Sequence, residues 1–281
     1  MTGAGAPERS DPVDVKPSPF RSLGREARQQ RITEIVVSRG TVSAQELAET
    51  FAVSVMTVHR DLDELQRRGV LRKSRGAATA QPSGIFESNV EYRSKANLED
   101  KQAIARYACG HVEPGMSVLL DDSTTALQMV PGLAALAPLT VATNYLTAMT
   151  ALAQHRDIDL VGLGGQYDVR HSSFLGNMCS ETVRSLRFDV AFVSTSAVMN
   201  GHAFHQEDRI VSVKREMVGV AGRAYLLLDH SKLRRTALHR LLPLHDFTAV
   251  IVDAGTSPAQ LAELEEHDVR VEVAGEVGRG R

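Results

Sequence analysis

Short polar sequences follow several apolar stretches in the second half of the chain, and their residue types suit the binding of an anion. Residues 121–125 read Asp-Asp-Ser-Thr-Thr and lie between a predicted strand and a predicted helix. Hydroxyl groups and free backbone N–H groups at the beginning of a helix can bind a phosphate or a carboxylate. Thr143-Asn144, Gly164-Gly165 and residues 229–232 (Asp-His-Ser-Lys) follow other predicted strands. One Ser/Thr cluster most often only caps a helix, but four such strand ends in one sheet favour a ligand site.

A second group of candidate residues is basic and lies near the N-terminus, where it could bind a polyanion. The whole chain has 32 Lys/Arg and 34 Asp/Glu, a formal charge of −2, whereas residues 21–80 hold 11 basic and 7 acidic residues, a balance of +4. Basic residues recur from Arg67 to Arg75 with no acidic residue between them. A charge run alone usually just solvates a helix face, so its meaning depends on the fold around it.

The pattern around these basic residues predicts three short helices followed by a strand. Residues 28–38 place apolar side chains on one stripe, and Ser43 with Glu46 forms a capping box before a second helix. Ser54 caps a third helix, and residues 70–73 are typical of a strand. Together they predict a winged helix-turn-helix, whose third helix enters the major groove of DNA. The residues predicted to contact DNA are Ser54, Met56, Thr57, His59, Arg60, Arg67, Lys73 and Arg75.

Alternating helices and strands follow, which predicts a second domain of the α/β class with a mostly parallel sheet. Apolar runs predict strands at residues 116–120, 139–143, 158–163, 190–194, 224–228, 249–252 and 269–273. Periodic patterns predict helices at residues 97–111, 125–136, 145–153, 179–186, 211–222 and 258–267. The predicted organisation is a disordered tail at 1–24, the winged helix-turn-helix at 25–80, a linker at 81–93 and the α/β domain at 94–275.

The composition argues against several other classes of protein. Cys109 and Cys179 are the only cysteines, too few for a disulfide framework or a cysteine zinc site. Residues 123–155 contain no Asp, Glu, Lys or Arg, but they include two prolines and so predict buried α/β core in place of a membrane-spanning helix. We therefore expect a soluble, cytoplasmic protein with no cofactor.

The third predicted helix resembles the recognition helix of the DeoR family of bacterial transcription regulators. The matching stretch, residues 53–65, reads Val-Ser-Val-Met-Thr-Val-His-Arg-Asp-Leu-Asp-Glu-Leu, and residues 73–78 resemble the family's wing. The family usually has Arg-Arg where this chain has His59-Arg60, and a His-Gly-Gly wing tip where it has Arg75-Gly76-Ala77. The resemblance implies sequence-specific binding to DNA, and the two departures bear on which operator is recognised.

The polar strand ends resemble the sensor domain of the same family, which is similar in fold to ribose-5-phosphate isomerase and coenzyme A transferase chains. The resemblance covers about residues 25–255 and implies a phosphorylated sugar or a related metabolite as effector. It implies that residues 123–125 and Lys232 hold phosphate. It also implies that Asp121 and Asn144 hold hydroxyl groups. The effector-binding residues expected on this basis are Asp121, Ser123, Thr124, Thr125, Thr143, Asn144, Gly164, Gly165 and Lys232.

Three departures from the family pattern bear on the ligand. Asp122 stands where a small neutral residue is usual, and it adds a carboxylate to the predicted anion site. Tyr145 replaces a usual Ser, and Ile210 stands where the family often has Glu. These residues motivate the hypothesis of a pocket altered in size and charge, suited to an atypical or unphosphorylated ligand.

The resemblance implies a regulator without enzyme activity. The chain is expected to bind double-stranded operator DNA, and hence the nucleoid, as a homodimer or tetramer. It is expected to repress a carbohydrate-metabolism operon until the effector binds. The alternative is a sugar-phosphate isomerase-like enzyme fused to a DNA-binding module, in which Asp121, Asp122 or Lys232 supplies an acid or a base.

A metal site is a weaker candidate. His202 and His205, together with Asp208, have a spacing that could ligate a metal ion. No third His or Cys lies nearby in the sequence, so a solvated loop is the favoured interpretation.

Overall fold

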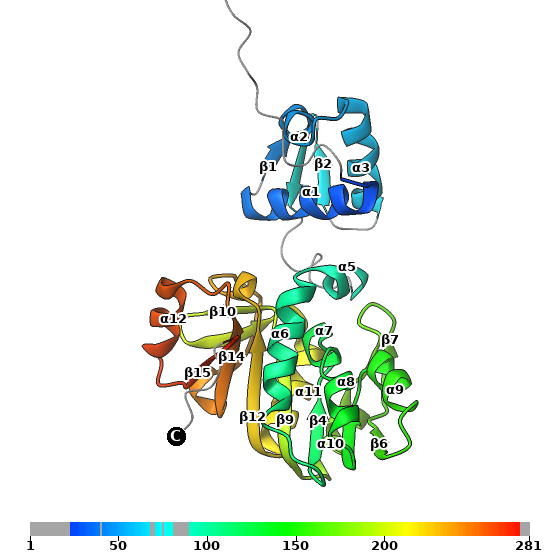
Figure 1. Cartoon of the computed structure of the whole chain (residues 1–281), viewed down its shortest axis with the longest axis vertical. Helices are drawn as coiled ribbons and strands as arrows, with labels where there is room; N and C mark the ends of the chain where they lie inside the picture. Colours follow the sequence, from blue (N-terminus) through cyan, green and yellow to red (C-terminus); the bar gives the residue numbers. More distant parts are fainter. Residues whose placement is uncertain (1–22, 40, 68–70, 75, 81–89, 276–281) are drawn as a thin grey trace, which may run out of the picture. The chain divides into compact units, whose positions relative to one another are not determined.

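The computed structural model describes residues 23–39, 41–67, 71–74, 76–80 and 90–275 of the 281-residue chain (Figure 1). The chain divides into two compact units, residues 1–80 and residues 81–281. We call them the N-terminal domain and the C-terminal domain, and each is described by itself.

The N-terminal domain combines short helices with a small antiparallel sheet. Its described part contains helices α1 (Arg25–Arg39), α2 (Ala44–Phe51) and α3 (Val55–Arg67). Strands β1 (Thr41–Ser43), β2 (Leu71–Ser74) and β3 (Ala77–Ala80) pair in the order β1-β3-β2. The predicted winged helix-turn-helix is confirmed, while β1 and β3 have no counterpart in the prediction because such short strands carry no periodic signal. The core consists of Ile32, Val36, Leu47, Phe51, Val58, Leu62, Leu65 and Leu71.

Serine side chains begin the second and third helices, as predicted. Ser43 Oγ accepts a hydrogen bond from the backbone N of Glu46 (3.0 Å), and Ser54 Oγ accepts one from the backbone N of Thr57 (3.1 Å). The predicted capping box at Ser43 is only half formed. The Glu46 carboxylate accepts a hydrogen bond from Arg39 Nη1 (3.1 Å) at the end of α1, in place of the reciprocal bond.

A buried carboxylate fixes α3 against α1. Asp61 is 1% exposed and accepts hydrogen bonds from Arg28 Nε (2.6 Å) and Gln29 Nε2 (2.9 Å), both on α1. Breaking a buried pair of this kind leaves one charge without a partner and commonly costs about 3–5 kcal/mol. The orientation of α3, which carries most of the predicted DNA contacts, therefore depends on this ion pair.

The C-terminal domain is built on a seven-stranded sheet in the order β15-β14-β12-β9-β4-β5-β6, with every neighbouring pair parallel. The strands are β4 (Ser117–Leu120), β5 (Leu139–Thr143), β6 (Ile158–Gly162), β9 (Phe188–Ser194), β12 (Ala221–Leu228), β14 (Ala249–Asp253) and β15 (Val271–Ala274). Each corresponds to one of the apolar runs in the sequence, which confirms the predicted α/β class.

Helices cover both faces of this sheet (Figure 1). On one face pack α6 (Leu98–Cys109), α7 (Thr124–Leu127) and α8 (Val130–Ala135), where Ile104 and Leu133 join a core that includes Phe192. On the other face pack α10 (Asn177–Arg184), α11 (Asp208–Gly219) and α12 (Pro258–Glu265), around a core that includes Val193. Adjacent residues of one strand enter different cores because strand side chains alternate between the two faces.

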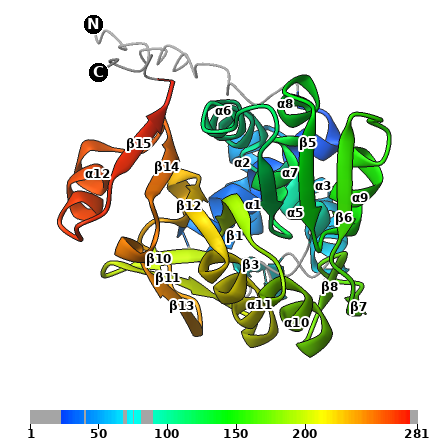
Figure 2. The ribbon, with the colours of Figure 1, turned by 90° about the horizontal axis from the view of Figure 1, so that it is seen from below.

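Several elements differ from the prediction. The helix expected at 125–136 is divided into α7 and α8, because Pro131 lacks a backbone N–H and lies in the first turn of α8. The hairpin of β7 (Gln166–Asp168) and β8 (Ser173–Leu175) was not expected. Nor was the small sheet of β10 (Ala197–Met199), β11 (His202–His205) and β13 (His239–Pro243), which Figure 2 shows. Helix α5 (Val90–Lys95) occupies part of the stretch assigned to a linker, whose residues 81–89 lie outside the described ranges.

The uncharged stretch at residues 123–155 belongs to the core of the C-terminal domain. It forms α7, α8, β5 and α9 (Leu146–Leu152), and its Met129, Leu133 and Leu152 are fully buried. Within the described ranges, no helix combines the length and the apolar character that crossing a membrane requires.

Candidate effector-binding and DNA-binding sites

Polar residues meet at the carboxyl ends of three adjacent strands of the C-terminal sheet, β9, β4 and β5. Asp121 follows β4, Asn144 follows β5 and Ser194 ends β9, and all three are buried. Because β4 pairs with both β9 and β5, these residues lie along one edge of the sheet. Parallel α/β sheets bind their ligands at this edge.

A buried lysine from α11 holds this edge together. Lys214 Nζ lies 2.5 Å from Asp121 Oδ2 and 3.1 Å from Asp122 Oδ1. It also donates a hydrogen bond to the carbonyl oxygen of Ser194 (3.0 Å). Asp121 accepts further hydrogen bonds from the backbone N atoms of Ser194 (2.7 Å) and Ser123 (3.0 Å). Lys214 therefore ties α11 to β9 and to the two carboxylates that follow β4.

The charges of this cluster stabilise one another. Burial alone would raise the pKa of Asp122, but Lys214, followed by His205 and Arg93, lowers it below its usual value. Burial opposes the charge of Lys214, yet the adjacent carboxylates of Asp121 and Asp122 raise its pKa. Burial lowers the pKa of His205 well below its usual value, and the charge of Lys214 adds to this effect. At neutral pH the cluster therefore contains a charged lysine and carboxylate beside a neutral imidazole.

Arg93 on α5 reaches the same region with unused hydrogen-bond donors. Its charge interacts with Asp122, His171 and His205, so its guanidinium lies near these side chains. Its Nε and Nη2 atoms are buried and have no hydrogen-bond partner among the described residues. A buried donor without a partner is costly, by about 1–3 kcal/mol, and a ligand oxygen would supply the missing bond.

Two more buried polar atoms at this edge lack a partner in the described part of the chain. They are Asn144 Oδ1, an acceptor, and Ser194 Oγ, which can donate and accept. Asn144 Nδ2 donates to the carbonyl oxygen of Phe174 (2.9 Å), which sets the direction of Oδ1. With the planar donor pair of Arg93, these atoms complement a ligand that carries both acidic oxygens and hydroxyl groups.

The predicted effector residues at the ends of β4 and β5 are used largely within the protein. Ser123 Oγ caps α7, and Thr124 Oγ1 donates to the carbonyl oxygen of Arg93 (3.3 Å). Thr143 Oγ1 accepts a backbone hydrogen bond (3.1 Å), and Thr125 is buried. Helix α7 has only four residues, so it is too short to provide the helix N-terminus expected there as an anion cradle.

The remaining predicted residues lie at the ends of other strands. Lys232 Nζ donates to the carbonyl oxygen of Thr195 (2.9 Å), just beyond β9. Gly164 and Gly165 follow β6, and a Cβ atom at Gly165 would lie 2.7 Å from the carbonyl oxygen of Leu175. Close backbone approach thus explains the glycine at 165 without any ligand.

Asp121, expected to hold hydroxyl groups of the effector, makes its contacts in this structure within the protein. Its two oxygens accept three hydrogen bonds from within the protein, which leaves about one of the four lone-pair sites of the carboxylate for a ligand hydroxyl. Two of the residues that depart from the family pattern, Tyr145 and Ile210, lie in the core and are each 1% exposed. Asp122, the third departure, accepts a hydrogen bond from Ser173 Oγ (3.0 Å) in addition to its ion pair with Lys214.

Sequence reasoning overlooked several residues of this cluster, namely Arg93, His171, His205 and Lys214. Lys214 had a detectable signal, because it interrupts the buried stripe of α11 that includes Met217. Arg93 lies in a stretch assigned to a linker, and nothing in its local pattern pointed to the sheet edge.

The exposed face of α3 suits a groove of DNA. Met56 is 62% exposed, and the exposed Arg60 has no carboxylate partner among the described residues. Ser54 Oγ and Thr57 Oγ1 lie 2.9 Å apart at the beginning of the helix. His59 is half-buried, and its Nδ1 atom lacks a partner within the described structure. Arg60 can therefore bind a guanine edge or a phosphate without breaking an ion pair.

The other predicted basic contacts are held by acidic neighbours. Arg67 forms an ion pair with Glu64, and Lys73 Nζ lies 2.5 Å from Asp63 Oδ1. Arg75 lies outside the described residues. Binding of phosphate by Arg67 or Lys73 has to compete with these pairs.

The ion pairs of Lys214 with Asp121 and Asp122 make the free energy of unfolding depend on pH, and the substitution Lys214→Met should reverse this dependence. In the wild type the lowered pKa of Asp122 contributes stability that is present above its unfolded value of 3.8 and is lost as the pH falls below it. In Lys214→Met the buried carboxylates lose their counter-charge, so we expect a loss of about 3–5 kcal/mol at pH 7. We expect the variant to regain stability between pH 7 and pH 5, as the carboxylates become protonated.

Urea denaturation at the two pH values, followed by circular dichroism, measures this effect. Arg106→Met, which removes a positive charge from an exposed position on α6, is the control and should behave like the wild type. Equal stability of Lys214→Met and the wild type at pH 7 would contradict the structural role given to Lys214.

Comparison with known proteins gives consistent results over both domains. The model of the DeoR-like helix-turn-helix domain matches residues 28–83, and the model of the DeoR C terminal sensor domain matches residues 96–254. The chain is 28% identical over 262 residues to a putative aga operon transcriptional repressor of Escherichia coli O157:H7, covering 91% of this chain and 96% of that protein. It is 27% identical over 247 residues to the glycerol-3-phosphate regulon repressor of Escherichia coli strain K12, covering 88% of this chain and 98% of that protein.

The chain is also similar to a solved structure of a D-ribose-5-phosphate isomerase in complex with phospho-erythronic acid. The similarity covers 48% of this chain and 54% of the isomerase chain, with 17% sequence identity and a TM-score of 0.37. The evidence for the family comes from the two domain models, which together extend from the first helix to the end of β14. The chain belongs to the DeoR family of transcription regulators, with a DNA-binding domain followed by a sensor domain.

Proposed function

We propose that this regulator is a repressor that releases its operator when the C-terminal domain binds a phosphorylated sugar or a related metabolite. The observation that carries the proposal is the buried guanidinium of Arg93, whose Nε and Nη2 atoms lack partners among the described residues. Two such N–H groups on one plane match two oxygens of a phosphate. The names of the relatives, one of them a glycerol-3-phosphate regulon repressor, agree with an effector of this kind.

In the proposed complex the phosphate accepts hydrogen bonds from Arg93 and Lys232, at the edge where Ser123, Thr124 and Thr125 also lie. The hydroxyl groups of the sugar bind the unpaired atoms Asn144 Oδ1 and Ser194 Oγ. Thr143, Gly164 and Gly165 shape the backbone around the ligand. Asp121 acts as a positioning residue, because its carboxylate holds Lys214.

Asp122 is compatible with a phosphorylated effector in this account. Its carboxylate would repel a phosphate if it stood alone, but Lys214 Nζ lies 3.1 Å from it. The charges of Asp121, Asp122, Lys214 and Arg93 cancel, and the pKa of His205 is lowered by burial and by Lys214, so this imidazole adds no charge at neutral pH. An arriving phosphate therefore meets a neutral cluster that contains unused donors.

We assign no catalytic residue to this site. Sugar-phosphate isomerisation needs a general base whose pKa lies near the working pH. Burial raises the pKa of Asp122, but Lys214 and its neighbours lower it overall, which makes this carboxylate a weak base. Asp121 is occupied by Lys214 and by backbone N–H groups.

Helix α5 provides a route from the effector to the DNA-binding domain. Arg93 lies on α5, which follows residues 81–89 directly, and its carbonyl oxygen accepts hydrogen bonds from Lys101 on α6 and Thr124 on α7. A ligand that binds the Arg93 side chain therefore favours one position of α5, and the segment before it transmits the preference as a shift in population. The regulator acts in the cytoplasm, as a homodimer or tetramer that reads paired half-sites.

Arg60→Ala should weaken binding to an operator fragment selected from genomic DNA. We expect a loss of about 1–3 kcal/mol, and a decrease of about one in the slope of log affinity against log salt concentration would identify a phosphate, in place of a guanine edge, as the group that Arg60 binds. Fluorescence anisotropy at several salt concentrations gives both values. The control is Arg106→Ala, which removes the same charge from an exposed position on α6. Equal binding by Arg60→Ala and the wild type would refute the contact.

Arg93→Ala should weaken the response to the effector at least tenfold and leave the DNA-binding domain intact. We expect operator affinity without ligand to stay within about twofold of the wild type. The concentration of sugar phosphate that releases the operator should rise at least tenfold, the factor that corresponds to a charge-assisted hydrogen bond of about 1.5–3 kcal/mol. Anisotropy titration with a mixture of sugar phosphates measures the release, and Arg106→Ala again serves as control. A normal response in Arg93→Ala would place the effector elsewhere.

A further inference from the structure

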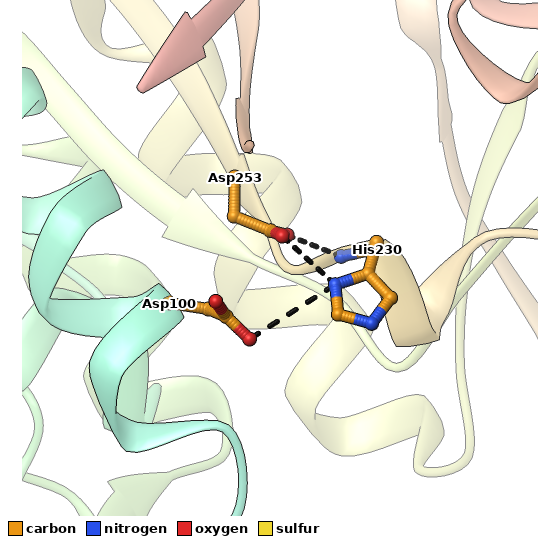
Figure 3. Close-up of side chains that lie close together, drawn as sticks. All are labelled: Asp100, His230 and Asp253. Atoms are coloured by element: carbon orange, nitrogen blue, oxygen red, sulfur yellow. Dashed lines mark hydrogen bonds and ion pairs between the residues drawn. The ribbon is translucent and has the colours of Figure 1, made fainter. Parts of the chain in front are cut away.

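Three side chains that could bind a metal ion come together away from the Lys214 cluster (Figure 3). Asp100 is on α6, His230 begins the short turn η1 (His230–Lys232) and Asp253 ends β14. One donor atom of each residue lies within 4.8 Å of the others, and within the described ranges no other group of three His, Cys, Asp or Glu residues meets this criterion. His202, His205 and Asp208, which the sequence suggested as ligands, do not form such a group.

The donor atoms have the spacing of ligands around one ion. His230 Nδ1 lies 2.8 Å from Asp253 Oδ2 and 4.0 Å from Asp100 Oδ2. Ligands about 2.1 Å from an ion lie about 3 Å apart when adjacent in an octahedron and about 4.2 Å apart when opposite. The 2.8 Å contact is a hydrogen bond, which a bound ion would replace, and the partly exposed side chains of Asp100 and His230 leave room for this adjustment.

Backbone contacts hold the buried carboxylate of the group in place. Asp253 is 1% exposed and accepts hydrogen bonds from the backbone N atoms of His230 (2.6 Å) and Gly255 (2.8 Å). A Cβ atom at Gly255 would lie 2.7 Å from Asp253 Oδ2 and 2.9 Å from His230 Nδ1. The loop after β14 thus closes tightly over these two donors, which is the preorganisation that a metal site needs.

The surroundings of the group are negative and open to water. Two of the three side chains in the group, Asp100 and Asp253, are carboxylates. Asp229 and Glu99 add further negative charge nearby. The side chains of His230 and Asp100 are 39% and 36% exposed, so an ion can enter and keep water molecules as additional ligands.

We propose that Asp100, His230 and Asp253 form a binding site for a divalent transition-metal ion. An imidazole nitrogen with two carboxylate oxygens suits Zn²⁺ or Mn²⁺ better than Mg²⁺, which binds almost entirely to oxygen. The bound ion joins the first turn of α6 to η1, two elements that are already linked by the hydrogen bond from Asn97 Nδ2 to Asp229 Oδ1 (2.9 Å). The site uses other side chains than the proposed effector site, although η1 carries both His230 and Lys232.

Isothermal titration calorimetry of the full-length protein, stripped with a chelator, tests the proposal with ZnCl₂, MnCl₂ and MgCl₂ as probes. We expect one Zn²⁺ or Mn²⁺ per chain, and Mg²⁺ binding that is at least tenfold weaker. The variants Asp100→Asn and His230→Gln change partly exposed side chains, and each should lower the affinity at least about tenfold. His202→Gln is the matched control and should bind like the wild type. Circular dichroism establishes that each variant is folded.

A second readout reports the ligands directly. Co²⁺ added to the stripped protein should give visible absorption bands that are absent in His230→Gln and present in His202→Gln. The proposal is overturned if no saturable binding of Zn²⁺ or Mn²⁺ occurs. It is equally overturned if Asp100→Asn and His230→Gln bind as tightly as the wild type.

Discussion

The ammonium group of Lys214 is the constraint on which the C-terminal domain depends. It lies in the buried interior, where a charge is stable only with partners, and its partners come from separate elements: the carboxylates that follow β4 and the last carbonyl oxygen of β9. Because α11 supplies the lysine, the position of this helix on the sheet is coupled to the shape of the strand ends. The N-terminal domain uses the same device, since the buried Asp61 binds Arg28 and sets α3 against α1.

The proposed effector site depends on the contrast between buried polar atoms that have hydrogen-bond partners within the protein and buried polar atoms that lack them. The carboxylates at the sheet edge are bound within the protein, whereas Arg93, Asn144 and Ser194 have buried atoms without a partner among the described residues. In the function that we propose, a ligand that completes these bonds lowers the free energy of the state in which Arg93 contacts it. Helix α5 carries Arg93 and follows the segment after the DNA-binding domain. In the proposed function, the contact between Arg93 and the ligand therefore also transmits ligand binding to the DNA-binding domain.

Much of the fold was predictable because buried parallel strands are uninterrupted apolar runs, and all strands of the large sheet were found in this way. The hairpin β7–β8 and the small sheet of β10, β11 and β13 were not, since strands such as β7 (Gln-Tyr-Asp) and β11 (His-Ala-Phe-His) contain polar residues and are not uninterrupted apolar runs. The polar residues after β4 and β5 could be placed together because parallel strands end at one edge. Lys214 could not be placed beside Asp121, because the two residues are 93 positions apart and only the packing of α11 brings them together.

The most direct test of the central claim is the selection of genomic fragments by the purified full-length protein, with and without a mixture of sugar phosphates. We expect a few fragments with repeated half-sites to be enriched, and we expect the mixture to release them. Dephosphorylated sugars at the same concentrations should leave them bound. Absence of enriched sites, or enrichment that the sugar phosphates do not change, would contradict a regulator that senses a phosphorylated ligand at the edge of its sheet.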